Sequence, residues 1–143
     1  MAVSAANTVS INGFVPVTQS IDVGPSSFNF GSMGAVNIAG PSYVDVTTSS
    51  TSWHVDATSS GNTTAGYMAN TTQAKWLGAA FNMSYVNGPT WHQTTIGSGP
   101  WTSFLSGAAA GHYNQTVYVQ QLVAPTDTSG TYSIVATFTL TAS

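Results

Sequence analysis

The sequence contains very few charged residues. Only 3% of its 143 residues are Asp, Glu, Lys or Arg, whereas an average globular protein has about 25%. Lys75 is the single lysine and there is no arginine, while the acidic residues are Asp22, Asp45, Asp56 and Asp127. A protein that neutralises the phosphates of nucleic acid or of an anionic membrane needs several basic side chains. Nucleic acid and membrane surfaces are therefore excluded as expected partners.

Cysteine is absent, which excludes disulfides, zinc ribbons and thiol catalysis together. No run approaches the ~18 consecutive apolar residues that cross a bilayer, so no membrane span is predicted. The first six residues have neither a basic region nor an apolar core, so they do not form a signal peptide. We interpret the chain as the mature form of an exported, extracellular protein.

Groups that could carry catalysis are scarce. Asp45 and Asp56 could be neighbours across two strands, like the carboxylate pair of a glycosidase, although solvated strand positions explain both residues better. His54, His92 and His112 are separated by 38 and 20 residues, which matches no metal-ligand motif. A Gly-x-Ser-x-Gly elbow is also missing. We expect no enzyme, no catalytic residue, no metal site and no cofactor.

Small hydroxyl side chains are abundant instead. Ser and Thr contribute 40 residues, more than a quarter of the chain, and they would keep a weakly charged surface wet outside the cell. Four Asn-x-Ser/Thr sequons make covalent glycans expected partners, although four is only slightly above chance for this composition. The candidate glycosylation sites are Asn62, Asn70, Asn82 and Asn114.

Alternation of apolar and polar residues dominates the remaining pattern and predicts β-strands. Strands are expected at 43–48, 52–58, 116–123 and 131–141, with turn signals of Gly, Pro, Asn and Ser between them. The 116–123 run is apolar on both faces, as in a central strand. The only helix candidate covers Thr72–Phe81. The sequence predicts a single antiparallel β-sandwich of Ig-like or jelly-roll type with at most one short helix.

Over 15 residues of the N-terminal segment, six apolar residues all have odd numbers and would share one face of an extended strand. They are Val9, Ile11, Val15, Val17, Ile21 and Val23. A strand of that length would measure about 50 Å, against a usual ~17–20 Å. Two interpretations remain open. In the first, the parts of this segment before and after Asn12-Gly13 are two strands of the same domain joined by a bend there. In the second, the first strand of the domain itself is Phe14–Val23. In the second interpretation the preceding residues project and pair with a neighbouring subunit, as in β-strand addition.

Two stretches carry a family resemblance. The closing hairpin, from Ala124-Pro-Thr-Asp-Thr-Ser-Gly to Thr-Leu-Thr-Ala142, is similar to that of many microbial surface β-sandwiches. Phe28-Asn-Phe-Gly31, followed by a strand and by Ser52-Trp-His-Val, resembles the layout of WxL-type and TasA/camelysin-like extracellular proteins. Low charge and an apolar N-terminal strand resemble the subunits of archaeal threads and bundling filaments. The paired Trp-x-Leu motifs of WxL proteins are absent, so peptidoglycan attachment is not expected.

The resemblance implies a homopolymer held together by donor-strand complementation: a glycosylated, pilus-like structural filament at the cell surface with a role in adhesion or biofilm. It divides the chain into a donor strand, 1–13, and a sandwich domain, 14–143. The implied donor residues are Val9 and Ile11, with Val3 and Ala5 as additions. The implied acceptor groove is lined by Val117, Val119, Tyr132, Ile134, Phe138 and Leu140.

Two other functions fit the same fold. In a secreted carbohydrate-binding module, exposed aromatic rings would stack on sugars, and the candidates are Trp76, Trp91, Trp101, Tyr85 and Tyr113. The alternative for these rings is packing in the core or between subunits. A viral capsid or S-layer component would also use a self-associating β-sandwich.

Overall fold

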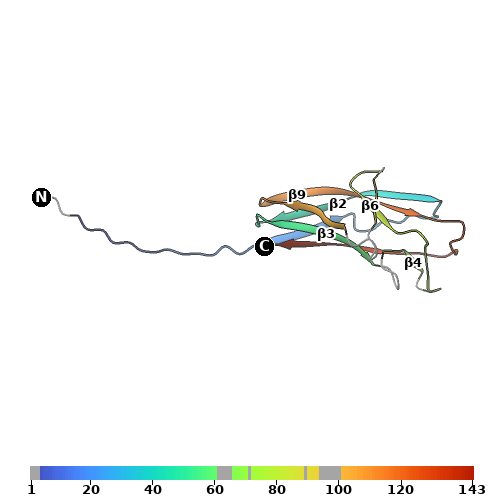
Figure 1. The fold of residues 1–143 in the computed structure, drawn as a ribbon, viewed down its shortest axis with the longest axis horizontal. Helices are drawn as coiled ribbons and strands as arrows, with labels where there is room; N and C mark the ends of the chain where they lie inside the picture. The colour runs from blue at the N-terminus through green and yellow to red at the C-terminus, as the bar shows by residue number, and fades with distance from the viewer. Residues whose placement is uncertain (1–3, 61–65, 71, 89, 94–100) are drawn as a thin grey trace.

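The computed structural model describes residues 4–60, 66–70, 72–88, 90–93 and 101–143. The chain forms antiparallel sheets that pack against each other as a β-sandwich (Figure 1), and this confirms the predicted fold class. None of the described residues is helical, so this part of the chain holds no apolar helix that could cross a bilayer. The strands are β1 (Gln19–Gly24), β2 (Val36–Thr48), β3 (Trp53–Ser60), β4 (Ala69–Asn70), β5 (Lys75–Trp76), β6 (Asn82–Ser84), β7 (His92–Gln93), β8 (Trp101–Gly107), β9 (Gly111–Leu122) and β10 (Val135–Ala142).

The strands are divided between two main sheets. The larger sheet has the order β1-β2-β9-β6-β7 and the smaller one β10-β3-β8, while β4 and β5 form a separate pair. Strand β9, predicted from its two apolar faces, is the central strand of the larger sheet. The edge strands β1 and β10 lie near each other on the same side of the sandwich.

The core lies between the two sheets and follows the predicted alternation. In β3, Trp53, Val55 and Ala57 are buried, while the residues between them are more exposed. Val44 and Val46 of β2 are fully buried in the same core. Alternate side chains of a strand point to opposite faces, so a one-residue slip of either strand would expose this entire set.

The C-terminal strand also has its predicted inner face. Tyr132, Ile134, Ala136, Phe138 and Leu140 pack against the core. Regular pairing with β3 begins only at Val135, opposite Ser60. The preceding residues meet β4 instead, through the bridge between Ala69 and Ser133.

Two local predictions were wrong. The helix expected over Thr72–Phe81 is replaced by a turn and by β5, and Ala74 has a φ of 52°, which a right-handed helix does not allow. The strand expected over Phe14–Val23 begins only at Gln19.

Candidate functional site: an exposed arm and an apolar groove

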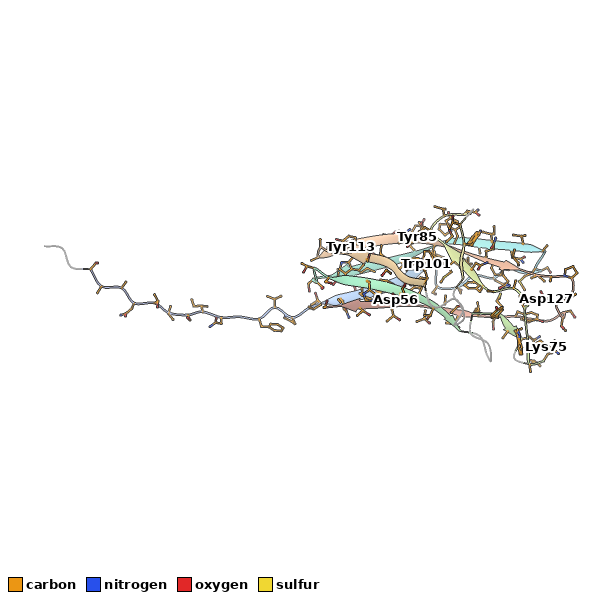
Figure 2. The ribbon with its side chains drawn as sticks, in the orientation of Figure 1. Asp56, Lys75, Tyr85, Trp101, Tyr113 and Asp127 are labelled. Atoms are coloured by element: carbon orange, nitrogen blue, oxygen red, sulfur yellow. The ribbon has the colours of Figure 1, made fainter. Side chains whose placement is uncertain are left out.

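The N-terminal residues form an extended arm outside the sandwich. Residues 4–17 belong to no strand and are exposed throughout, and Figure 1 shows them leaving the domain at the end where the C-terminus lies. The exposed fraction is 80% for Val9, 88% for Ile11 and 87% for Phe14. Figure 2 shows the side chains of the arm standing free of the folded domain. Single exposed apolar residues are ordinary, but five large apolar side chains exposed along one short segment indicate an interaction surface.

The folded domain begins at Thr18. Its carbonyl accepts a hydrogen bond of 2.9 Å from the Ser49 amide, and its own amide donates one of 2.8 Å to Ser49 Oγ. Beyond this point Ile21 and Val23 of β1 pack against the core. The odd-numbered apolar residues are therefore split between the domain and the arm. Ala5 lies in the exposed arm, whereas Val3 lies outside the described residues.

An apolar groove opens on the other half of the sandwich. Its volume is about 740 Å³, whereas an apolar cavity of about 150 Å³ already holds a benzene-sized molecule. The groove therefore has room for several aliphatic side chains. Its apolar lining consists of Val23, Pro25, Phe28, Phe30, Met33, Met68, Phe81, Met83, Val117, Val119, Tyr132, Ile134, Val135, Ala136 and Phe138.

Five of the six proposed acceptor residues line this groove. They are Val117, Val119, Tyr132, Ile134 and Phe138. Leu140 packs against the core but lies outside the lining. The lining also contains Phe30, Met33 and the buried Met83, which the sequence pattern did not predict. The first two belong to an irregular loop, where no period marks the inner face, and β6 is only three residues long.

The groove exists because the two neighbouring edge strands are incomplete. Strand β1 ends at Gly24, opposite Tyr43, although β2 extends back to Val36. Pro25 follows, and it has no N–H to donate to a ladder. On the opposite sheet, regular β10 begins only at Val135. The space between these edges is crossed by the irregular segment 25–35.

The groove is electrically neutral. None of the described residues lining it is Asp, Glu, Lys, Arg or His. The described Asp and Lys side chains lie elsewhere, and Lys75 and Asp127 stand at the end of the domain opposite the arm (Figure 2). Uncharged polar residues complete the lining, namely Ser26, Ser27, Asn29, Ser42, Thr131 and Ser133. An uncharged, largely apolar occupant fits this groove best, because an unpaired charge buried there would lose its hydration.

Asp45 and Asp56 lie in different sheets among the described residues. Asp45 belongs to β2 in the larger sheet and contacts His112. Asp56 belongs to β3 in the smaller sheet, where His54 lies 3.5 Å away and the Ser103 amide donates at 2.8 Å. The expectation that Asp45 and Asp56 could be cross-strand neighbours was therefore wrong.

The histidines are also dispersed among the described residues. His54 and His112 lie in different sheets, and the side chain of His92 is outside the described part. No group of three or more potential metal ligands occurs among the residues that were described.

Most of the candidate sugar-stacking rings pack against other aromatic rings within the sandwich. Tyr85 packs on Trp101, with ring centroids 4.6 Å apart, and Figure 2 shows the two together inside the domain. Burial raises the pKa of Tyr85 above its ordinary value, and its hydroxyl donates a hydrogen bond to the Phe104 carbonyl. Tyr113 packs on Trp53. Trp76 is half-exposed in β5 and Trp91 is partly buried.

The sequons differ in accessibility. Asn70 and Asn82 are buried, and their side-chain amides donate to Gln73 and Gln120. A glycan on either nitrogen would have to displace these contacts. Asn114 is exposed on β9, whereas Asn62 lies outside the described residues.

Comparison with protein-family models, with curated proteins and with solved structures gave no match to this chain.

Proposed function

We propose that the protein is the structural subunit of an extracellular filament and that it polymerises head-to-tail by donor-strand complementation. The arm of one subunit fills the groove of the next. One observation supports this most strongly: the same chain has an exposed apolar strand-like segment and an unfilled apolar groove on opposite halves of one domain.

The dimensions of the arm suit this role. Residues 4–17 are 14 residues, and an extended chain of that length spans about 46 Å at ~3.3 Å per residue. Contacts between two different surfaces of identical subunits propagate as an open filament when the rotation from one subunit to the next does not close a ring. Main-chain pairing supplies affinity in strand addition, and alternate side chains supply specificity. Val9 and Ile11 are the proposed inserted residues.

The surface chemistry supports an extracellular setting. With 3% charged residues and 40 Ser and Thr, the sandwich presents hydroxyl groups where cytoplasmic proteins present mixed charge. The resemblance to archaeal threads and TasA-like fibres leads to the same proposal. Adhesion or biofilm formation is the proposed role, and covalent glycans would cover the exposed faces.

Introducing one carboxylate into the inserted face should weaken assembly strongly. Ile11→Asp removes about 1.5–3 kcal/mol of side-chain burial and places an unpaired charge in the neutral groove. We expect the concentration needed for filament formation to rise at least about 100-fold, since 1.4 kcal/mol is tenfold in affinity. Sedimentation and negative-stain micrographs over a concentration series measure this change.

Ser10→Asp is the matched control for this experiment. It adds the same charge one residue away, on the opposite face of the extended arm, where water remains available. Its filaments should form at nearly the concentration of the unmodified chain. Equal effects of Ser10→Asp and Ile11→Asp, or no effect of either, would contradict insertion of the odd-numbered face.

Glycosylation, where it occurs, should be found at Asn114 rather than at Asn70 or Asn82. Asn114 is the exposed member of these three, so a glycan there leaves the sandwich intact. Intact-mass measurement of protein from its native source should lose one glycan mass in Asn114→Gln and keep its mass pattern in Asn70→Gln and Asn82→Gln. A glycan mapped to Asn70 or Asn82 in folded protein would overturn this assignment.

A further inference from the structure

Part of β2 has a free hydrogen-bonding edge. Its residues from Tyr43 to Thr48 pair with β1, while Val36–Ala39 and Ser42 pair, among the described residues, with β9 on one side only and are separated by an irregularity at Gly40-Pro41. Residues 25–34 pass nearby, but among the described residues they form no backbone–backbone hydrogen bond with β2. They are held through side chains, since Ser42 Oγ donates to the Pro25 carbonyl at 2.7 Å. An unpaired edge of this kind is a template for another strand.

The outer face beside this edge is apolar. Val36 is 59% exposed, and Ile38 and Leu122 are also exposed. Val36 and Leu122 are direct partners across β2 and β9, so the three form one patch. The outer face of β10, the other available edge, is less apolar, because Val135 is 64% exposed there but Thr137 and Thr139 follow it on the same face.

Phe14 breaks the odd-numbered pattern of the large apolar residues in the arm. The other large apolar residues of the arm have odd numbers, whereas Phe14 has an even number and is 87% exposed. In an extended arm its ring lies on the face opposite Val9 and Ile11. When those residues enter the groove, Phe14 must lie on the outer face of the completed sheet.

The direction of the incoming arm follows from the position of the strands. The arm continues directly into β1 (Figure 1), and β1 runs from the base of the arm to Val23, which lines the groove. Strand β2 is antiparallel to β1, and β10 ends near the base of the arm, where the Ser143 amide donates to the Ser52 carbonyl. In subunits that follow one another in the same orientation, the incoming arm therefore runs antiparallel to both β2 and β10.

We propose that the incoming arm adds to the free edge of β2 in the antiparallel direction and places Phe14 on the patch of Val36, Ile38 and Leu122. This inference rests on the proposed function and specifies its contact surface. With Phe14 opposite Val36, antiparallel counting places Asn12 opposite Ile38. Ile11 then lies opposite Ala39 on the inner face, where Ala39 packs against the core. A subunit whose own arm folded back into its groove would have the arm parallel to β2.

Disulfide trapping tests this register, and the absence of native cysteine removes any background. Two populations of subunits each carry one cysteine, either in the arm (Asn12→Cys or Phe14→Cys) or in β2 (Val36→Cys or Ile38→Cys). They are mixed, polymerised, checked for filaments by electron microscopy, oxidised, and separated on a non-reducing gel. A covalent dimer of an arm variant with a β2 variant can form only between subunits.

Directly opposite residues have Cα atoms about 4.5–5.5 Å apart, within the range of a disulfide, whereas diagonal neighbours are about 7–8 Å apart and beyond it. We expect the pairs Phe14→Cys with Val36→Cys and Asn12→Cys with Ile38→Cys to form at least about tenfold more dimer than the exchanged pairs. The exchanged pairs are Phe14→Cys with Ile38→Cys and Asn12→Cys with Val36→Cys. Thr137→Cys on β10 is the control for the other edge and should give no dimer.

The outcomes separate this inference from the proposed function. Dimer from the exchanged pair Asn12→Cys with Val36→Cys, or from Thr137→Cys, within intact filaments would overturn the register or the choice of edge and leave donor-strand assembly standing. Filaments that give no dimer with any β2 variant would overturn the β2 edge as the contact surface. A chain without substitutions that forms no filaments at all would overturn the proposed function itself.

Discussion

A chain lacking Ala2–Asn12 is expected to fold normally and to form no filaments. Among the described residues, the first hydrogen bonds between the N-terminal region and the domain involve Thr18, and residues 4–12 are exposed and belong to no strand of the sandwich. They include both proposed inserted residues, Val9 and Ile11. Size-exclusion chromatography should show a monomer, electron micrographs should show no fibres, and the far-UV circular dichroism should remain that of a β-protein.

Adding the missing strand back provides the control for this deletion. A synthetic peptide of residues 4–17 should bind the truncated domain and raise its Tm, since a ligand that binds only the folded state stabilises it by RT ln(1 + [L]/Kd), about 2.7 kcal/mol at 100 times Kd. The same peptide with Ile11→Asp should give a much smaller shift. Filaments that persist after the deletion, or equal shifts with both peptides, would contradict the donor role of the arm.

Replacing Phe104 by Ala should cause the largest loss of domain stability. Phe104 is 1% exposed, and its ring centroid lies 5.3 Å from that of Tyr85, 4.9 Å from that of Trp101 and 5.1 Å from that of Phe138. Truncation of a buried Phe typically costs 3–5 kcal/mol, that is, about 4 kcal/mol here, because transfer and cavity terms add. Chemical denaturation of the truncated monomer measures the free energy of unfolding.

Phe14→Ala in the same truncated background is the matched control. It makes the same chemical change in the exposed part of the arm, so the free energy of unfolding of the monomer should change by less than about 0.5 kcal/mol. A loss below about 1 kcal/mol for Phe104→Ala would show that the aromatic cluster does not form the centre of the core.

The fold could be predicted because the strands that form the core alternate regularly. Trp53, Val55 and Ala57 share a face in the sequence and are buried together in β3. The helix predicted near Trp76 was wrong, since three apolar residues in a short segment fit either period. In that segment Leu77 is buried by contacts with residues distant in the sequence, and its backbone amide donates a hydrogen bond to the Met68 carbonyl. Such tertiary contacts decide short segments and leave no periodic signal.

Only part of the candidate site could be predicted from the sequence. Parity grouped Val9 with Val23 as one strand-like segment, but it could not show that the domain begins at Thr18, since a strand and an extended arm have the same alternation. The groove was harder to predict. Its lining joins β9 and β10 with the irregular loop that carries Phe30 and Met33, and only the packing of the two sheets brings these segments together.

Placing the arm and the groove on opposite halves of one domain gives any polymer built in this way two chemically different termini. One terminal subunit keeps an empty groove, and the other keeps an arm without a neighbour. A cap for the first must be a short apolar strand, whereas a cap for the second must be a receiving groove. Elongation and anchoring would then need different partner molecules, and growth could be stopped at one terminus while it continues at the other.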